Sequence, residues 1–130
     1  MSISIASRKA KGRNFQGWIA KQISRVTGIP DGKDELIEKR EMGQQGVDIK
    51  LYGIAKEKYP FSIEAKNQMT FSIPSWVKQA KENKIKGTDW QLFITKNHYD
   101  KLVIMDADTW FDFWEQYLNL LYGKDHKIAK

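Results

Sequence analysis

The chain has 130 residues, which suits one domain with an ordinary hydrophobic core. Its 22 lysines and arginines exceed its 16 aspartates and glutamates, and the net charge of +6 favours phosphate-bearing partners, although a basic protein can also be simply well solvated. The absence of cysteine excludes disulfides and thiolate metal sites, and without a long apolar run or a signal peptide we expect a cytoplasmic protein with no membrane partner.

The first third of the chain predicts a helix followed by a strand. Residues 1–12 are basic and lack an apolar pattern, so we interpret them as an extended N-terminal arm. Residues 13–27 repeat apolar side chains at helical spacing, and the glycines and proline of residues 28–32 predict the end of that helix. A weak strand is predicted over residues 36–42, followed by a turn at residues 43–46.

The middle of the chain predicts two more strands. Residues 47–52 and residues 61–66 alternate apolar and polar side chains, and residues 53–60 form a connection that can include one helical turn. Because side chains alternate along a strand, Glu64 and Lys66 share one face of the third strand, opposite the apolar face.

The last third predicts a helix over residues 74–86, because proline is well placed in a first helical turn. Two apolar strands follow at residues 90–95 and 101–105, joined by a hairpin-like turn. The order helix, three strands, helix, two strands, helix (αβββαββα) predicts a three-layer α/β domain over residues 13–123, with a central mixed sheet flanked by helices and a polar tail at residues 124–130.

The final helix is unusually apolar. Asp106 or Asp108 can cap its start, and Gly123 predicts its end. Its aromatic and leucine side chains have two interpretations that stay open, namely burial inside the monomer and part of a homodimer interface.

Asp48, Glu64 and Lys66 are the residues with the clearest chemical meaning. Carboxylates on adjacent strands can converge on one face of the sheet, and one or two carboxylates are what Mg²⁺ usually takes from a protein. We therefore predict Asp48, Glu64 and the backbone carbonyl of Ala65 as metal ligands, with Lys66 stabilising charge or orienting water during phosphodiester hydrolysis. The alternative is an ordinary ion pair on a solvated strand face. His98 and His126, the only histidines, lack metal-ligand spacing.

Short motifs around these residues are similar to a known family. Gly46-Val47-Asp48 with Glu64-Ala65-Lys66 resembles the PD-(D/E)xK nuclease superfamily, and Lys11-Gly12-Arg13 resembles the start of the first helix in archaeal-type Holliday-junction resolvases. Small phage-encoded members resemble the chain further, over about residues 8–115, in the runs Met42 to Asp48 and Tyr59 to Gln68, in Trp76 and in Gln79-Ala80.

The resemblance implies a restriction-endonuclease-like fold and a Mg²⁺-dependent DNA endonuclease, with Mn²⁺ as a substitute metal. It implies a structure-selective enzyme like the junction resolvases, which acts on branched, nicked or single-stranded DNA. A homodimer and a bacterial or archaeal cytoplasm, with a cellular or phage-borne gene, belong to the same expectation. A non-catalytic DNA-binding protein that keeps the nuclease fold is the alternative, and a basic scaffold protein is a third hypothesis.

Two glutamines and one further carboxylate are candidates for the same site. Gln16 occupies the position of a first-helix glutamate that joins the metal site in these resolvases, and its amide brings no charge. Gln79 matches a helix glutamine that lies near the metal in related nucleases, and Glu41 is an alternative third carboxylate. For both glutamines an ordinary solvated helix position is the competing interpretation.

Basic and polar side chains along the chain predict contacts with the DNA backbone. Such contacts neutralise phosphates without reading sequence. A solvated surface is the alternative for each of them. The predicted DNA-binding residues are Arg8, Lys9, Lys11, Arg13, Gln44, Gln45 and Lys78.

Overall fold

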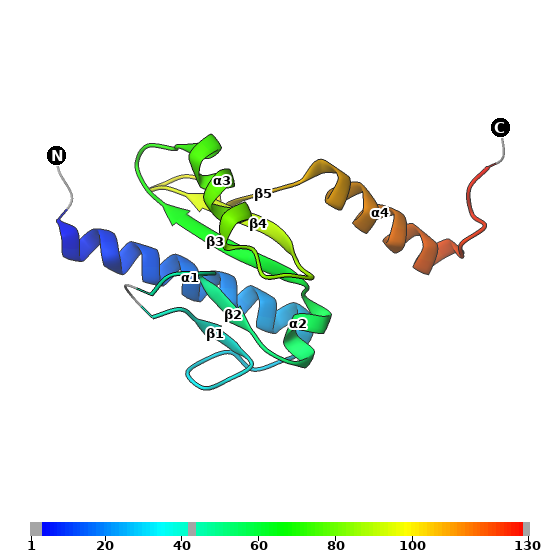
Figure 1. The fold of residues 1–130 in the computed structure, drawn as a ribbon, viewed down its shortest axis with the longest axis horizontal. Helices are drawn as coiled ribbons and strands as arrows, with labels where there is room; N and C mark the ends of the chain where they lie inside the picture. Colours follow the sequence, from blue (N-terminus) through cyan, green and yellow to red (C-terminus); the bar gives the residue numbers. More distant parts are fainter. Residues whose placement is uncertain (1–3, 42–43, 129–130) are drawn as a thin grey trace.

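A computed structural model describes residues 4–41 and 44–128 of the chain. Figure 1 shows a sheet with helices around it and one helix that extends away from the rest. The elements are α1 (Ile5–Thr27), β1 (Ile37–Lys39), β2 (Ile49–Leu51), α2 (Ile54–Lys58), β3 (Phe61–Asn67), α3 (Ile73–Asn83), β4 (Asp89–Thr95), β5 (Leu102–Met105) and α4 (Ala107–Tyr122).

The five strands form one mixed sheet in the order β1-β2-β3-β4-β5. β1, β2 and β3 pair antiparallel, β3 and β4 pair parallel, and β4 and β5 form an antiparallel hairpin. A parallel pair needs a crossover connection, and α3 supplies it. The predicted α/β class with a mixed sheet and flanking helices is therefore confirmed, with α2 as an additional short helix in the connection between β2 and β3.

The prediction of an extended arm is wrong for residues 5–12, which form the first turns of α1. The side-chain oxygen of Ser4 caps this helix by accepting a hydrogen bond from the Ser7 N–H at 3.1 Å. The predicted end is confirmed, because Gly28 has a φ of 74° and its N–H donates to the Ser24 carbonyl at 2.8 Å. A single helix thus crosses the boundary predicted between arm and domain.

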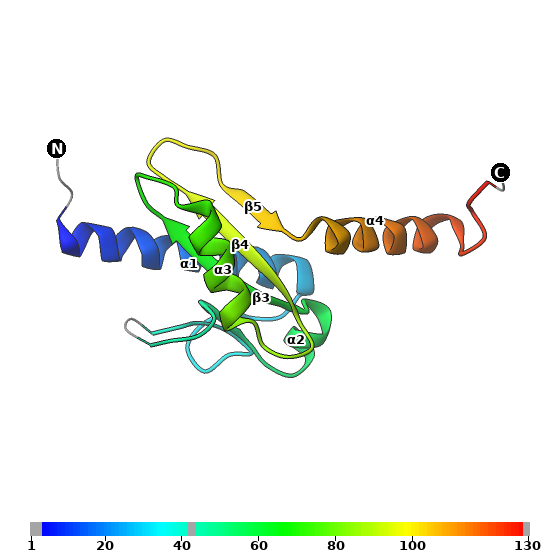
Figure 2. The same cartoon turned by 45° about the horizontal axis from the view of Figure 1, so that its top comes forward.

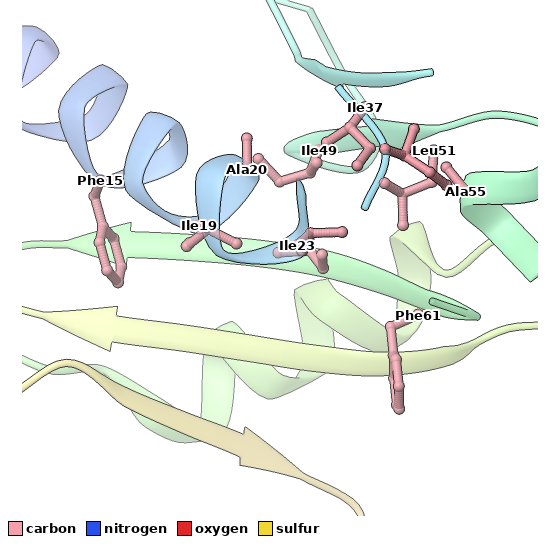
Figure 3. Packing of buried hydrophobic residues seen from close by; sticks show 11 residues of the cluster. Phe15, Ile19, Ala20, Ile23, Ile37, Ile49, Leu51, Ala55 and Phe61 are labelled. Carbon is pink, nitrogen blue, oxygen red and sulfur yellow. The ribbon is translucent and has the colours of Figure 1, made fainter. Parts of the chain in front are cut away.

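The larger hydrophobic cluster lies between α1 and one face of the sheet. Figure 3 shows side chains of α1 directed toward the strands, together with residues of β1, β2, α2 and β3. Buried β-branched and aliphatic side chains dominate it, as expected for strands half covered by a helix. Its buried members are Phe15, Ile19, Ala20, Ile23, Ile29, Ile37, Ile49, Leu51, Ala55, Phe61 and Ile63.

A smaller cluster lies on the opposite face, where α3 covers β3 and β4 (Figure 2). Trp76 of α3 packs there with Leu92 and Ile94 of β4. Because Ile63 belongs to the α1 side, the alternation along β3 turns Glu64 toward α3. The fold therefore places a carboxylate under a helix, where burial rather than solvent determines its behaviour.

α4 differs from the other long helices because it contains no buried residue. The side chain of Asp106 caps it, accepting from the Asp108 N–H at 2.9 Å, and Gly123 ends it as predicted. Phe113 stacks on Phe61 of β3, with ring centroids 5.2 Å apart, while both views show the helix running away from the sheet. The interpretation that its apolar side chains are buried inside the monomer is thus wrong.

Among the described helices, none combines the length and the apolar character needed to cross a bilayer.

Tyr59 links the connection before β3 to β4, and its hydroxyl donates to Gln91 Oε1 at 2.6 Å. Burial raises the pKa of Tyr59 to about 12. A raised folded-state pKa means that the tyrosine's contribution to stability is fully present below pH 10 and is lost as the pH rises from 10 toward about 12.

Replacing Tyr59 by Phe should cost about 1 kcal/mol at pH 8, because the buried Gln91 oxygen loses its donor.

That difference between the native chain and Tyr59→Phe should shrink between pH 10 and 12, because the variant has no phenol to titrate at this position. Urea unfolding at pH 8 and at pH 11 measures both quantities. An equal loss of stability in the two proteins over this interval would contradict the assignment.

Candidate active site

Asp48 lies where β2 begins to separate from β3. Ile49 pairs with Ile63, and the Asp48 N–H donates to the Ile63 carbonyl at 2.8 Å. Beyond this point the Ala65 N–H bonds the Asp48 side chain, Oδ2, at 2.7 Å. The carboxylate satisfies a backbone donor that would otherwise be left unpaired, which fixes its position beside Glu64.

Arg40 is the main partner of Asp48, and sequence reasoning did not identify it. Lys39 pairs with Ile49, so Arg40 lies opposite Asp48, and the Arg40 N–H donates to the Asp48 carbonyl at 2.8 Å. Its guanidinium lies 2.7 Å from Asp48 Oδ1 through Nη2 and donates from Nη1 to the Gly46 carbonyl at 3.0 Å. Its Nε is buried without a hydrogen-bond partner among the described residues.

Glu64 and Lys66 lie on one face of β3, as their spacing predicts. The Lys66 ammonium is 3.7 Å from Glu64 Oε1, and the Asn83 amide of α3 donates to Glu64 Oε2 at 3.4 Å. The side chains of Asp48 and Glu64 are only 3% exposed, whereas those of Arg40 and Lys66 are 19% and 18% exposed. Two buried carboxylates are therefore faced by two cations that reach toward solvent.

The surroundings of both carboxylates raise their pKa above the ordinary values. Burial raises the pKa of Asp48, against the opposing effects of the Ala65 N–H, Arg40 and Lys66. Burial also raises the pKa of Glu64, and the neighbouring negative charge of Asp48 raises it further. Additional positive charge at this point would relieve both effects.

A cavity of about 760 Å³ opens over these carboxylates. Residues from the first half of α1, from the end of β1, from β3 and the loop after it, and from α3 contribute to its wall. The sequence-predicted candidates that line it are Arg8, Lys9, Lys11, Gln16, Glu41, Asp48, Glu64, Ala65, Lys66 and Gln79.

Four predicted DNA-binding residues do not line this cavity. Arg13, Gln44 and Gln45 are exposed away from it, and Lys78 lies on the outer side of α3, where its ammonium is 3.9 Å from Glu82. Within residues 4–41 and 44–128, the structure thus separates the predicted basic residues into a group at the cavity and a group elsewhere on the surface.

The donor set suits a hard divalent cation. Two carboxylates and a backbone carbonyl are oxygen ligands of the kind Mg²⁺ takes, with water and substrate oxygens completing the coordination. No group of three His, Cys, Asp or Glu side chains gathers in the part of the chain that the structure describes, and Glu41 lines the cavity outside any such group. Gln16 lines the cavity without adding charge. A metal ion at Asp48 would share that carboxylate with Arg40 and the Ala65 N–H.

Comparison of the chain with protein-family models, with curated proteins and with solved structures finds no match.

Glu64→Gln should stabilise the metal-free protein at pH 7. When the pKa of a carboxyl is raised in the folded state, the folded protein loses stability as the pH rises from the carboxyl's ordinary pKa through its folded-state pKa. A charged Glu64 is therefore unfavourable in the folded protein at neutral pH. The amide keeps an acceptor for Asn83 and removes the charge, and we expect a gain of about 1 kcal/mol.

Urea unfolding in the presence of EDTA measures this gain, because bound metal would favour the carboxylate. Glu41→Gln is the matched control, since Glu41 is exposed and should change the free energy of unfolding by less than about 0.5 kcal/mol. A Glu64→Gln protein less stable than the native chain would overturn the electrostatic assignment.

Proposed function

We propose that the chain is a Mg²⁺-dependent DNA endonuclease with a restriction-endonuclease-like fold, and that Mn²⁺ can replace Mg²⁺. The observation that carries this proposal is the convergence of Asp48, Glu64 and Lys66 at adjacent strands, at the base of a cavity with a basic wall. The motifs that contain these residues resemble those of PD-(D/E)xK nucleases, and the mixed sheet flanked by helices is compatible with that fold.

The side chains divide the chemistry of phosphodiester hydrolysis among themselves. When bound, Mg²⁺ supplies a Lewis acid for the phosphoryl oxygen and lowers the pKa of water. Asp48, Glu64 and the Ala65 carbonyl hold the cation. Lys66 lies beside Glu64, where its ammonium can orient the attacking water and stabilise the charge that develops on the phosphate.

Arg40 has a place in the same scheme. Its guanidinium neutralises Asp48 in the metal-free site and is 19% exposed, so it is positioned at the border between the carboxylates and the cavity. With a metal ion present, Arg40 and Lys66 make the site net positive, and a phosphodiester is the anion that fits such a site.

The basic wall of the cavity suits a polyanion such as DNA. Arg8, Lys9 and Lys11 contribute basic side chains to its wall from the first three turns of α1. We propose that they bind phosphates next to the scissile one. The resemblance to junction resolvases extends the proposal to branched, nicked or partly single-stranded DNA, and to a cytoplasmic enzyme, phage-encoded or cellular.

A non-catalytic DNA-binding protein is the second candidate, and one specific observation favours it. Both oxygens of Asp48 already have partners, Arg40 and the Ala65 N–H, each at 2.7 Å. A site completed by internal partners needs no metal. The exchange of the resolvase glutamate for Gln16 agrees with this candidate, because the amide supplies no negative charge for a cation.

Asp48→Asn, Glu64→Gln and Lys66→Gln should each reduce DNA cleavage at least about a hundredfold, because each removes a charge that acts on the metal or on the reacting phosphate. DNA binding in EDTA should remain. Cleavage should require Mg²⁺ or Mn²⁺ and disappear in EDTA. A panel of linear duplex, nicked duplex, flap, single-stranded and four-way-junction DNA provides the measurement.

Lys78→Gln is the matched control for Lys66→Gln, since it removes the same charge outside the cavity and should leave the rate unchanged. Cleavage that persists in EDTA would refute the metal mechanism. Absence of cleavage on the whole panel, with salt-sensitive binding retained, would establish the non-catalytic candidate instead.

Lys9→Gln combined with Lys11→Gln should weaken binding to DNA of any sequence and lower the salt dependence of log K by about two, one for each phosphate contact removed. Lys33→Gln combined with Lys124→Gln changes the net charge equally at positions that do not line the cavity. Fluorescence anisotropy titrations between 50 and about 200 mM salt measure both slopes. If log K depended equally on salt concentration in the two double variants, the cavity would not be part of the DNA-binding surface.

A further inference from the structure

The fold leaves many large apolar side chains of α4 exposed. Six aromatic side chains of this helix are between 42% and 70% exposed, and Leu120 and Leu121 are 87% and 56% exposed. A helix of 16 residues with no buried side chain has little to stabilise it in water, since packing of an apolar face supplies most helix stability in proteins. The aromatic residues are Trp110, Phe111, Phe113, Trp114, Tyr117 and Tyr122.

The exposed area is the size of one half of a protein interface. Tyr122 lies at an outer b position; at roughly 200 Å² for each aromatic side chain, the other five leave about 520 Å² accessible, toward the upper end of the patch sizes usual for monomers. The two leucines bring the total near the roughly 800 Å² that each partner buries in a standard interface.

The spacing of these residues is that of a helix-pairing seam. Trp110, Trp114, Tyr117 and Leu121 follow one another at intervals of four, three and four, which are the a and d positions of heptads. Phe111, Phe113, Leu118 and Leu120 flank the seam at e and g positions. The apolar face is therefore wide and continuous.

The charges of α4 lie away from the seam and oppose those of the remaining chain. Asp108, Asp112 and Glu115 are on the outer b and f positions, and the helix has no lysine or arginine. The net charge of +6 thus divides into −3 on α4 and +9 on the other residues. This distribution disfavours nucleic acid on α4, because phosphates would be repelled by its acidic side.

We propose that α4 is the self-association surface of this chain and that its partner is α4 of a second copy. The two helices pack antiparallel through their seams, a two-fold arrangement in which the same patch serves both subunits and closes the assembly. The antiparallel direction separates the two acidic first halves and places the two basic bodies at opposite ends of the helix pair. No described residue of α4 lines the cavity of the candidate site, so the proposal does not depend on the chemistry proposed there.

Sedimentation equilibrium of the full chain over micromolar to high micromolar concentrations tests the proposal. The native chain should show twice its mass of 15.2 kDa. Trp114→Glu and, as a second seam variant, Trp110→Glu should weaken association at least about thirtyfold, the effect of losing a central aromatic anchor. Gln116→Glu adds the same charge on the polar side of α4 and should leave the mass unchanged.

Because no residue of α4 is buried in the monomer, the seam variants should keep the far-ultraviolet dichroism of the sheet domain and its cooperative unfolding. Tryptophan emission gives a second measurement on the native chain, since Trp110 and Trp114 should shift to longer wavelength when the dimer is diluted and dissociates. A native chain that stays at 15.2 kDa throughout, or seam variants that associate as the native chain does, would overturn the proposal.

Discussion

The carboxylate of Asp48 is the interaction on which the rest of the structure depends. It lies beside three strands at once, bonded to Arg40 after β1 and to the Ala65 N–H in β3 while its own backbone precedes β2. The paired residues of β2 and β3 are limited to Ile49 with Ile63. Beyond this pair, the Asp48 side chain rather than a backbone carbonyl accepts the hydrogen bond of the Ala65 N–H. A buried charge is tolerated only when it is paired and hydrogen-bonded, and Arg40 with Ala65 meets both conditions. Strand association and the candidate chemistry therefore rest on the same carboxylate, and selection on either one constrains the other.

The candidate site was partly predictable because strand alternation is a simple rule. It was enough to place Glu64 and Lys66 on a common face, and the preceding strand offered Asp48 to the same face. The role of Arg40 depended on hairpin register. A two-residue turn at the centre of residues 43–46 would put Glu41 opposite Asp48, whereas the observed register differs by one residue and puts Arg40 there. This shift of one residue in the pairing register places a guanidinium, and not a further carboxylate, beside Asp48. The side-chain pattern of a three-residue strand is too short to decide between the two registers.

The helices show a different limit of sequence reasoning. α1 extends well before its apolar stripe because Ser4 caps it and its basic residues are adequate helix formers, so the stripe predicted where the core begins and not where the helix begins. The existence, cap and end of α4 followed from its pattern. Its lack of buried residues could not be predicted, because an apolar helix face indicates that the face is covered but does not indicate which surface covers it.

α1 has two halves with different local stability. Its first buried residue is Phe15, and the turns that carry Arg8, Lys9 and Lys11 come before it, with the Asn67 amide donating to the Lys11 carbonyl at 3.4 Å. Opening these turns would expose almost no apolar surface, while opening the second half would disrupt the core. The first half of α1, which forms the basic wall of the cavity, can therefore change its conformation more easily than the buried carboxylates beside it. Under the proposed function, this wall would follow the varying path of a bent or branched DNA backbone while the carboxylates keep their geometry.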